Sequence, residues 1–192
     1  MVGDGPPLGQ RCLQSASSSV MALVLPAVQP QGYRGHHADM IQKKNLGNAG
    51  EFYVLAQLAQ RGFVAGKTDD GQTLIDVIAT EPETLQTVNI QVKTTSSTAK
   101  VPRWIMSSKN ELVFDSLWYV LVRLTDPDHL PSFYVFHSNE IGPWLQADHA
   151  GWLAGDPSRK DSKVRNFRPT ADELAERANA WDRMFGPAVS GS

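Results

Sequence analysis

The chain has 192 residues, 41% of them hydrophobic and 20% charged, a composition typical of one folded domain with a real core. Eighteen Lys and Arg residues oppose twenty Asp and Glu residues, giving a net charge of −2, so a uniformly basic nucleic-acid coat is excluded and any phosphate-binding surface must be local. The only cysteine, Cys12, excludes an internal disulfide and a four-thiolate zinc site. These features predict a protein of a reducing, cytoplasmic compartment.

No run of apolar residues approaches the roughly 18 that a membrane span requires. The apolar run at residues 20–28 is short and contains Pro26. It is similar to the core of a signal peptide, but the segment before it carries Asp4 and only Arg11, which is a poor charged region. We therefore expect neither membrane insertion nor secretion.

Three segments are predicted from composition. Residues 1–40 are rich in Gly, Pro, Ser and Gln, which is typical of a flexible arm. Residues 41–186 carry the periodic apolar patterns of a single domain, and residues 187–192 form a short flexible tail.

The domain is predicted to open with a helix over residues 46–61, and Gly62 is a natural stop. Apolar residues recur there at helical spacing. The predicted core-facing positions are Ala49, Phe52, Tyr53, Ala56 and Ala59.

Several strands are predicted after a turn at residues 69–71. The first two cover residues 74–79 and 88–93, and the short linker between them, which contains Pro82, favours an antiparallel pair. Further strands are predicted at residues 104–106, 117–122 and 133–136.

The C-terminal part of the domain is predicted to end in a helix over residues 170–185, because Thr170 and Glu173 form a capping box. The region before it has no clear period, and Trp144 and Trp152 are its expected packing anchors. A helix, then strands, then a helix predicts a mixed α/β or α+β domain.

Four residues form a candidate site for a divalent metal ion. Asp76 lies among apolar residues, where an unpaired carboxylate is costly to bury. Gln91 and Lys93 are two positions apart on the next strand and therefore project from one face, and Glu51 flanks the core-facing stripe of the first helix. Mg²⁺ takes one or two carboxylates together with waters and phosphate oxygens. Asp76 is the leading ligand, Gln91 a weaker amide ligand, and Lys93 suits orientation of water or stabilisation of charge on a phosphate.

These residues resemble the PD-(D/E)xK nuclease superfamily, in particular small members with glutamine in the third position. The resemblance implies a restriction-endonuclease-like core, with a central mixed β-sheet flanked by helices, that hydrolyses DNA with Mg²⁺ or Mn²⁺ and often forms a homodimer. By position, Asp76 would be the metal aspartate, Gln91 the variant acidic position and Lys93 the catalytic lysine. Glu51 would be the helix carboxylate, and the carbonyl of Val92 would complete the metal site.

Two departures from the motif leave an alternative open. Ile75 stands where the family has proline, which is a mild change, and Gln91 removes one negative charge, which weakens metal affinity. The alternative is a catalytically inactive module of the same fold that binds nucleic acid or protein. A third interpretation is a structural domain with no affinity for nucleic acid.

The site residues also have purely structural interpretations. Asp76 suits a salt-bridged position at a strand end, and Lys93 suits a solvent-facing edge strand that resists aggregation. Gln91 suits an exposed polar face. Glu51 suits the first turn of a helix, where the helix dipole favours a carboxylate.

Candidate DNA contacts lie outside the four-residue site. Thr94 and Thr95 follow the lysine and suit hydrogen bonds to phosphates, and Trp104, next to Arg103, suits base stacking. A basic run with five positive charges and one negative charge has a local charge of +4 and predicts either a phosphate-contacting patch or a solvated loop. The five basic residues are Arg159, Lys160, Lys163, Arg165 and Arg168.

Overall fold

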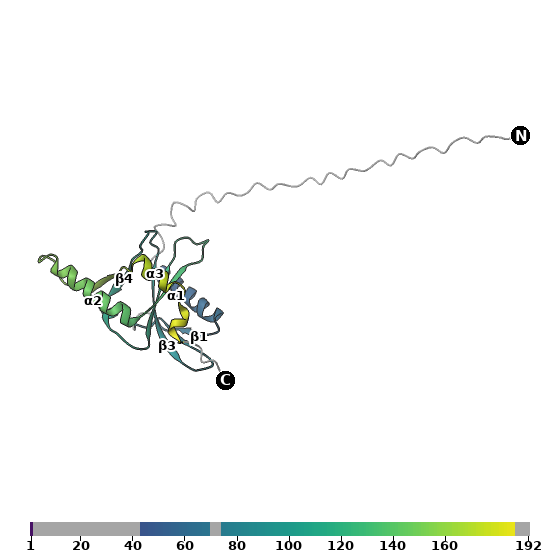
Figure 1. Cartoon of the computed structure of the whole chain (residues 1–192), viewed down its shortest axis with the longest axis horizontal. Helices are drawn as coiled ribbons and strands as arrows, with labels where there is room; N and C mark the ends of the chain where they lie inside the picture. The colour runs from purple at the N-terminus through teal and green to yellow at the C-terminus, as the bar shows by residue number, and fades with distance from the viewer. Residues whose placement is uncertain (2–42, 70–73, 187–192) are drawn as a thin grey trace.

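The computed structural model describes Met1, residues 43–69 and residues 74–186 (Figure 1). Apart from Met1 and Asp69, the predicted N-terminal arm at residues 1–40, the turn at residues 69–71 and the tail at residues 187–192 lie outside the described residues. The elements in chain order are α1 (Lys43–Gln60), β1 (Val64–Lys67), β2 (Val77–Thr80), β3 (Thr87–Thr95), β4 (Trp104–Ser107), the 3₁₀ turn η1 (Ser108–Glu111), β5 (Leu117–Arg123), β6 (Ser132–His137), α2 (Ser138–Ala154), β7 (Val164–Phe167), α3 (Ala171–Arg177) and the 3₁₀ turn η2 (Trp181–Met184).

A mixed sheet forms the centre of the described chain. Its five strands have the order β1-β2-β3-β5-β6, in which β3 and β5 are parallel and every other neighbouring pair is antiparallel. A separate antiparallel ribbon pairs β4 with β7. The predicted antiparallel pair of β2 and β3 and the predicted mixed α/β class, a central mixed sheet flanked by helices, are confirmed.

Side chains on the two faces of this sheet form two hydrophobic cores. On β5, Val120 and Val122 belong to one core together with Val54 and Leu58 of α1, and η2 closes that core. Alternate residues of β5 belong to the second core, which α2, α3 and the β4–β7 ribbon cover; they are Leu117, Tyr119 and Leu121. Because both faces are covered, β5 is apolar along nearly its whole length, as a buried strand requires.

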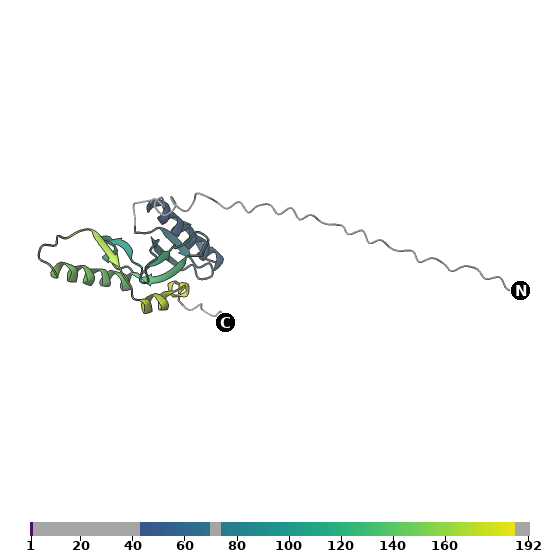
Figure 2. The ribbon, with the colours of Figure 1, turned by 90° about the horizontal axis from the view of Figure 1, so that it is seen from above.

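One part of the molecule projects from the central sheet (Figures 1 and 2). From here on we call this part the arm, as distinct from the flexible N-terminal arm predicted at residues 1–40. It consists of α2, the β4–β7 ribbon and residues 155–163, which join α2 to β7. No helix in the described part of the chain combines the length and apolarity that crossing a bilayer requires.

The buried face of α1 differs from the predicted one. Val54 and Leu58 are fully buried and Gly50 is buried beside them, whereas Phe52 is 61% exposed. The predicted core positions Ala56 and Ala59 are exposed as well. Both sets of residues satisfy helical spacing, so periodicity alone does not choose between them. The close approach of α1 to β3 at Gly50 determines which face of the helix is buried.

The C-terminal helix is shorter than predicted. The capping box of Thr170 and Glu173 is present, but α3 ends at Arg177. Ala178 forms a β-bridge with Tyr134, and Asn179 has a positive φ of 51°. Pairing with β6 therefore outweighs local helix propensity, as tertiary contacts commonly do.

Helix α2 was not predicted, because Gly142, Pro143 and Gly151 disfavour a helix there. Its first turn is capped by His137 and Glu140, and Ile141 and Leu145 are buried in the second core. Burial of this apolar face stabilises the helix despite its composition.

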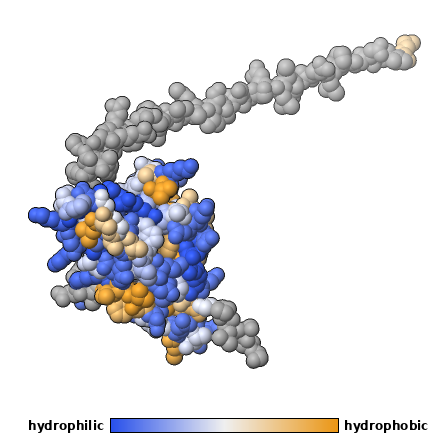
Figure 3. All heavy atoms as spheres, turned by 60° about the vertical axis from the view of Figure 1, so that its left-hand side comes forward, coloured by the Kyte–Doolittle hydropathy of each residue, from blue (hydrophilic) through white to orange (hydrophobic). Residues whose placement is uncertain are grey.

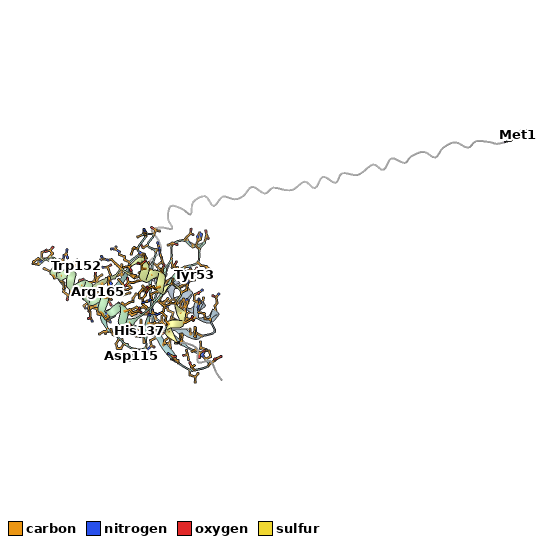
Figure 4. The ribbon with its side chains drawn as sticks, viewed as in Figure 1. Met1, Tyr53, Asp115, His137, Trp152 and Arg165 are labelled. Atoms are coloured by element: carbon orange, nitrogen blue, oxygen red, sulfur yellow. The ribbon has the colours of Figure 1, made fainter. Side chains whose placement is uncertain are left out.

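The two tryptophans of α2 have different environments. Trp144 packs on Phe167, as expected of an anchor, with ring centroids 4.9 Å apart. Trp152 lies toward the outer end of α2 and is 42% exposed, so the prediction that it anchors the core is wrong (Figure 4). It stacks instead on His149 and on Arg159.

The contact between α1 and β3 predicts opposite effects of alanine at two glycines. A Cβ added at Gly50 would lie 2.0 Å from Oγ1 and 3.1 Å from Cβ of Thr94, whereas one added at Gly47 would meet nothing within 4 Å. We expect Gly50→Ala to lower the free energy of unfolding by about 1–3 kcal/mol through overpacking. Gly47→Ala should raise it by about 0.5–1 kcal/mol through helix propensity. Urea unfolding of both variants measures the difference, and equal stabilities would contradict the proposed contact.

Candidate active site

Asp76 lies at the point where β2 begins. The predicted strand at residues 74–79 is observed only from Val77, so Asp76 precedes the strand instead of lying within it. Its backbone is held on both sides: the Asp76 N–H donates to the carbonyl of Ile90 and the Asp76 carbonyl accepts from the N–H of Thr68, both at 2.9 Å. Neighbouring strands on either side thus fix the position of the carboxylate.

The Asp76 carboxylate bridges to β3. Its Oδ2 accepts hydrogen bonds from the side-chain amide of Gln91 and from the backbone N–H of Val92, both at 2.7 Å. Hydrogen bonds to an ionised carboxylate are short and strong, so they hold Asp76 in one orientation. Among the described residues, no group donates a hydrogen bond to the other oxygen, Oδ1.

Glu51 reaches the site from helix α1, which packs on the sheet. Its Oε2 lies 3.0 Å from Nζ of Lys67 on β1, and the Glu51 side chain is only 15% exposed. The same Oε2 is buried and accepts no hydrogen bond of good geometry from the described residues. The ion pair thus leaves this oxygen with unused capacity to bind a cation. Lys67 was not predicted, because β1 has only four residues, too few for a reliable alternation.

Lys93 lies on the part of β3 that extends beyond the last β2 pair, Val77 with Ile90. Burial lowers the pKa of Lys93 below its ordinary value of 10.5, and the negative charges of Asp76 and Glu51 oppose this shift. Both carboxylates are thus close enough to act on the ammonium group electrostatically. The structure brings together three of the four predicted site residues as a charged cluster.

Gln91, the fourth residue, belongs to a buried hydrogen-bond network behind the carboxylates. It is 5% exposed, so the alternative of an exposed polar face does not hold. Its amide oxygen accepts from Nδ2 of Asn110 at 3.4 Å, and the same Nδ2 donates to the hydroxyl of Tyr119 at 3.2 Å. Oδ1 of Asn110 accepts from the backbone N–H of Ser107 at 2.8 Å.

The network determines which way the Gln91 amide is oriented. Because the backbone N–H of Ser107 can only donate, it fixes the oxygen of Asn110 and turns the Asn110 nitrogen toward Gln91. The Gln91 oxygen then faces Asn110 and its nitrogen faces Asp76. Gln91 therefore positions Asp76 in this structure, and its oxygen does not face the carboxylates as a metal ligand would.

The side chains at the site determine which metal ion it could hold. Within the described ranges, no group of three His, Cys, Asp or Glu side chains is placed to hold a metal. Two carboxylates, Asp76 and Glu51, with free coordination capacity suffice for Mg²⁺ or Mn²⁺, because such ions keep several waters and bind substrate phosphate oxygens. The set fits a hard cation of this kind. Participation of the Val92 carbonyl stays a prediction.

Some of the predicted DNA-contacting residues are packing residues instead. Trp104 is fully buried and its indole N–H donates to the carbonyl of Val122, so it cannot stack on a base. Arg165 is 7% exposed and pairs with Glu111. The hydroxyl of Thr94 is buried against Gly50. These three residues support the fold.

The other predicted contacts lie nearer the surface. Arg159 is exposed but tied to the arm, where it donates to the carbonyl of Trp152 and stacks on its ring. Thr95 is half-buried, and its hydroxyl accepts from the N–H of Ser97. The other exposed basic residues of the set are Arg103, Lys160, Lys163 and Arg168.

Comparison with known proteins gives similarity of structure only. No protein-family model and no curated protein sequence match the chain. The bacterial homing endonuclease I-Ssp6803I is similar over 74% of this chain and 91% of its own, with 13% identity and a TM-score of 0.48. Hjc, a Holliday junction resolvase from Archaeoglobus fulgidus, covers 64% of this chain and 89% of its own, with 11% identity and a TM-score of 0.37.

The lowered pKa of Lys93 predicts a pH-dependent term in stability. Between the native pKa and 10.5, the unfolded chain binds a proton that the native chain has released, so the free energy of unfolding rises with pH. Lys93→Met removes this term, and we expect the stability of the native protein relative to Lys93→Met to rise with pH over the range between the native pKa of Lys93 and its ordinary value of 10.5.

Urea unfolding at each pH measures this difference. Lys109→Met, which removes an exposed lysine of η1, is the matched control. Parallel stability curves for the native protein and Lys93→Met would contradict the burial argument.

Proposed function

We propose that this protein is a Mg²⁺-dependent endonuclease that hydrolyses DNA phosphodiester bonds, and that it acts as a homodimer where both strands are cut. The observation that carries the proposal is the convergence of Asp76, Glu51 and the partly desolvated Lys93 where β3 extends beyond β2. Phosphate ester hydrolysis needs charge stabilisation and an oriented water molecule, and this cluster can supply both. The fold by itself hosts many functions, so the proposal depends on these side chains.

Each residue has a separate role in the proposed reaction. Asp76 and Glu51 would hold the cation, which neutralises phosphate charge and lowers the pKa of water when bound. Lys93 would hydrogen-bond the attacking water or a non-bridging phosphate oxygen. The water oxygen forms a new bond to phosphorus, the bond from phosphorus to the leaving oxygen breaks, and the leaving oxygen takes a proton from solvent. Because its pKa is lowered, a larger fraction of Lys93 than of a free lysine is neutral at a given pH, and the neutral amine would take the proton that the attacking water loses.

Gln91 would be a positioning residue in this scheme. Its amide holds Oδ2 of Asp76, which leaves Oδ1 for the cation. Because it brings no negative charge, the site has one carboxylate fewer than the acidic motif would give. We therefore propose that the cation binds weakly until substrate phosphate oxygens complete its coordination.

Cleavage of a DNA panel tests the proposed activity. Supercoiled plasmid, single strands, branched duplexes and methylated DNA should be incubated with Mg²⁺ or Mn²⁺ at low salt. We expect at least one substrate to be cut, with no cutting in EDTA. Asp76→Asn and Lys93→Met should each reduce the rate by about 10²- to 10⁴-fold, since each removes charge stabilisation or proton transfer.

Lys109→Met, purified identically, serves as the control and should cut at the native rate. Equal cutting by all variants would assign the activity to another site or a contaminant. Binding without cutting by the native protein would favour the inactive DNA-binding module, which the neutral Gln91 also suits.

A restored carboxylate at position 91 gives a second test. Gln91→Glu would place a second negative charge against Asp76 and lose the 2.7 Å hydrogen bond, so we expect a lower melting temperature in EDTA. Added Mg²⁺ should raise the melting temperature of Gln91→Glu more than that of the native protein, because three carboxylates attract a cation more strongly than two. Gln146→Glu, an exposed change on α2, controls for the added charge. No Mg²⁺-dependent difference between the two variants would argue against a cation between Asp76 and Glu51.

A further inference from the structure

The β4–β7 ribbon has one buried face and one exposed face. Its register pairs Trp104 with Phe167 and Met106 with Arg165, and all four side chains are buried toward the arm interior. The alternate positions form the outer face, where Ile105 lies opposite Asn166 and Ser107 lies opposite Val164. Two apolar residues on this face are exposed: Ile105 is 61% exposed and Val164 is 54% exposed. No contact within the described part of the fold accounts for their exposure.

Two arginines lie at one end of this outer face. Extending the register by one step beyond Trp104 and Phe167 brings Arg103 opposite Arg168, and both are exposed. Like charges at opposite positions of a ribbon repel each other. Neither arginine has an ion-pair partner among the residues that the structure describes, so the position suits an external anion.

The outer face carries no acidic residue. Its residues are Arg103, Ile105, Ser107, Val164, Asn166 and Arg168. Lys160 and Lys163, on the segment that leads into β7, are also exposed, and the exposed Asp161 lies between them in the sequence. From the side of the arm the surface is largely hydrophilic with separate apolar patches (Figure 3). A basic surface on a chain with a net charge of −2 is a local concentration of positive charge and favours a polyanion over an ordinary protein surface.

The ribbon is joined to the candidate active site at both ends of β4. At the start of β4, the indole of Trp104 bonds the carbonyl of Val122, which pairs with Thr94, the residue after Lys93. At its end, Ser107 holds Asn110, which in turn contacts Gln91. Both links start from the covered side or the backbone of β4, so they fasten the ribbon to β5 and to β3, the strand that carries Lys93.

We propose that the outer face of the β4–β7 ribbon enters the major groove of duplex DNA and positions the strand for cleavage. The proposal rests on the proposed nuclease function and adds the element that recognises the substrate. A two-stranded ribbon fits the major groove, which is about 12 Å wide. Arg103 and Arg168 contact phosphates at the groove edge, Asn166 hydrogen-bonds base edges, and Ile105 packs on thymine methyl groups.

Binding measurements in the Asp76→Asn background test the proposal without cleavage. The added double substitution Arg103→Gln with Arg168→Gln should weaken binding to a duplex at least tenfold and reduce the slope of log K against log salt by about 2. The added pair Arg61→Gln with Lys109→Gln removes the same charge elsewhere and should leave the slope within about 1 of the Asp76→Asn parent. Thermal unfolding of each variant verifies that the fold is intact.

Groove chemistry identifies where the ribbon binds. Dimethyl sulfate methylates guanine N7 in the major groove and adenine N3 in the minor groove. The Asp76→Asn protein should protect N7 positions, and adding Asn166→Ala with Ile105→Ser should remove that protection while retaining most of the affinity. Protection of adenine N3 alone would overturn the proposal.

The outcomes separate the two proposals. If the otherwise native protein cuts DNA and the ribbon substitutions change neither affinity, salt slope nor protection, the ribbon proposal fails and the proposed function stands. If the native protein neither binds nor cuts any DNA of the panel, both proposals fail.

Discussion

The hydrogen bonds that Oδ2 of Asp76 accepts from Val92 and Gln91 are the interaction on which the candidate site depends. The paired part of β2 stops at Val77, opposite Ile90, while β3 continues to Thr95. A side chain, and not a second strand, therefore satisfies the N–H of Val92. The same carboxylate thereby takes the place of a missing strand beside β3 and lies close to Lys93. Asp76 therefore contributes both to the hydrogen bonding of the sheet and to the candidate active site.

Buried polar groups around Asp76 need partners, and the structure supplies them in a chain that runs from Ser107 through Asn110 and Gln91. Each member of such a network limits the orientation of the next. Glutamine at position 91 is compatible with this chain because an amide can donate to Asp76 and accept from Asn110 at the same time. A carboxylate there could only accept, and would need a cation or a proton beside Asp76.

Burial divides the residues of the β4–β7 ribbon into an inward-facing group and an outward-facing group. Trp104 and Arg165 face inward and hold the ribbon against the rest of the molecule. Their neighbours one position along each strand face outward. This alternation is the ordinary period of a β-strand, but it decides which arginine pairs with Glu111 and which ones stay available for a ligand. The ribbon lies alongside α2 (Figure 2), and this packing supports the outer face from beneath.

Local patterns in the sequence determined most of the central sheet. The strands at residues 88–93, 117–122 and 133–136, the capping box at Thr170 and the pairing of β2 with β3 follow from short-range apolar and turn signals. The grouping of Asp76 and Lys93 followed from the motif. These features depend on residues close together in the chain, whose effect does not need the rest of the fold.

Only the tertiary structure decided the remainder. Helix α2 forms because the second core covers Ile141 and Leu145, α3 ends because Ala178 pairs with β6, and Gly50 selects the buried face of α1 through its contact with Thr94. The ion pair of Glu51 with Lys67 and the orientation of the Gln91 amide join residues distant in sequence. Such contacts have no local signature, because burial and pairing between distant segments outweigh local propensity only once the chain has folded.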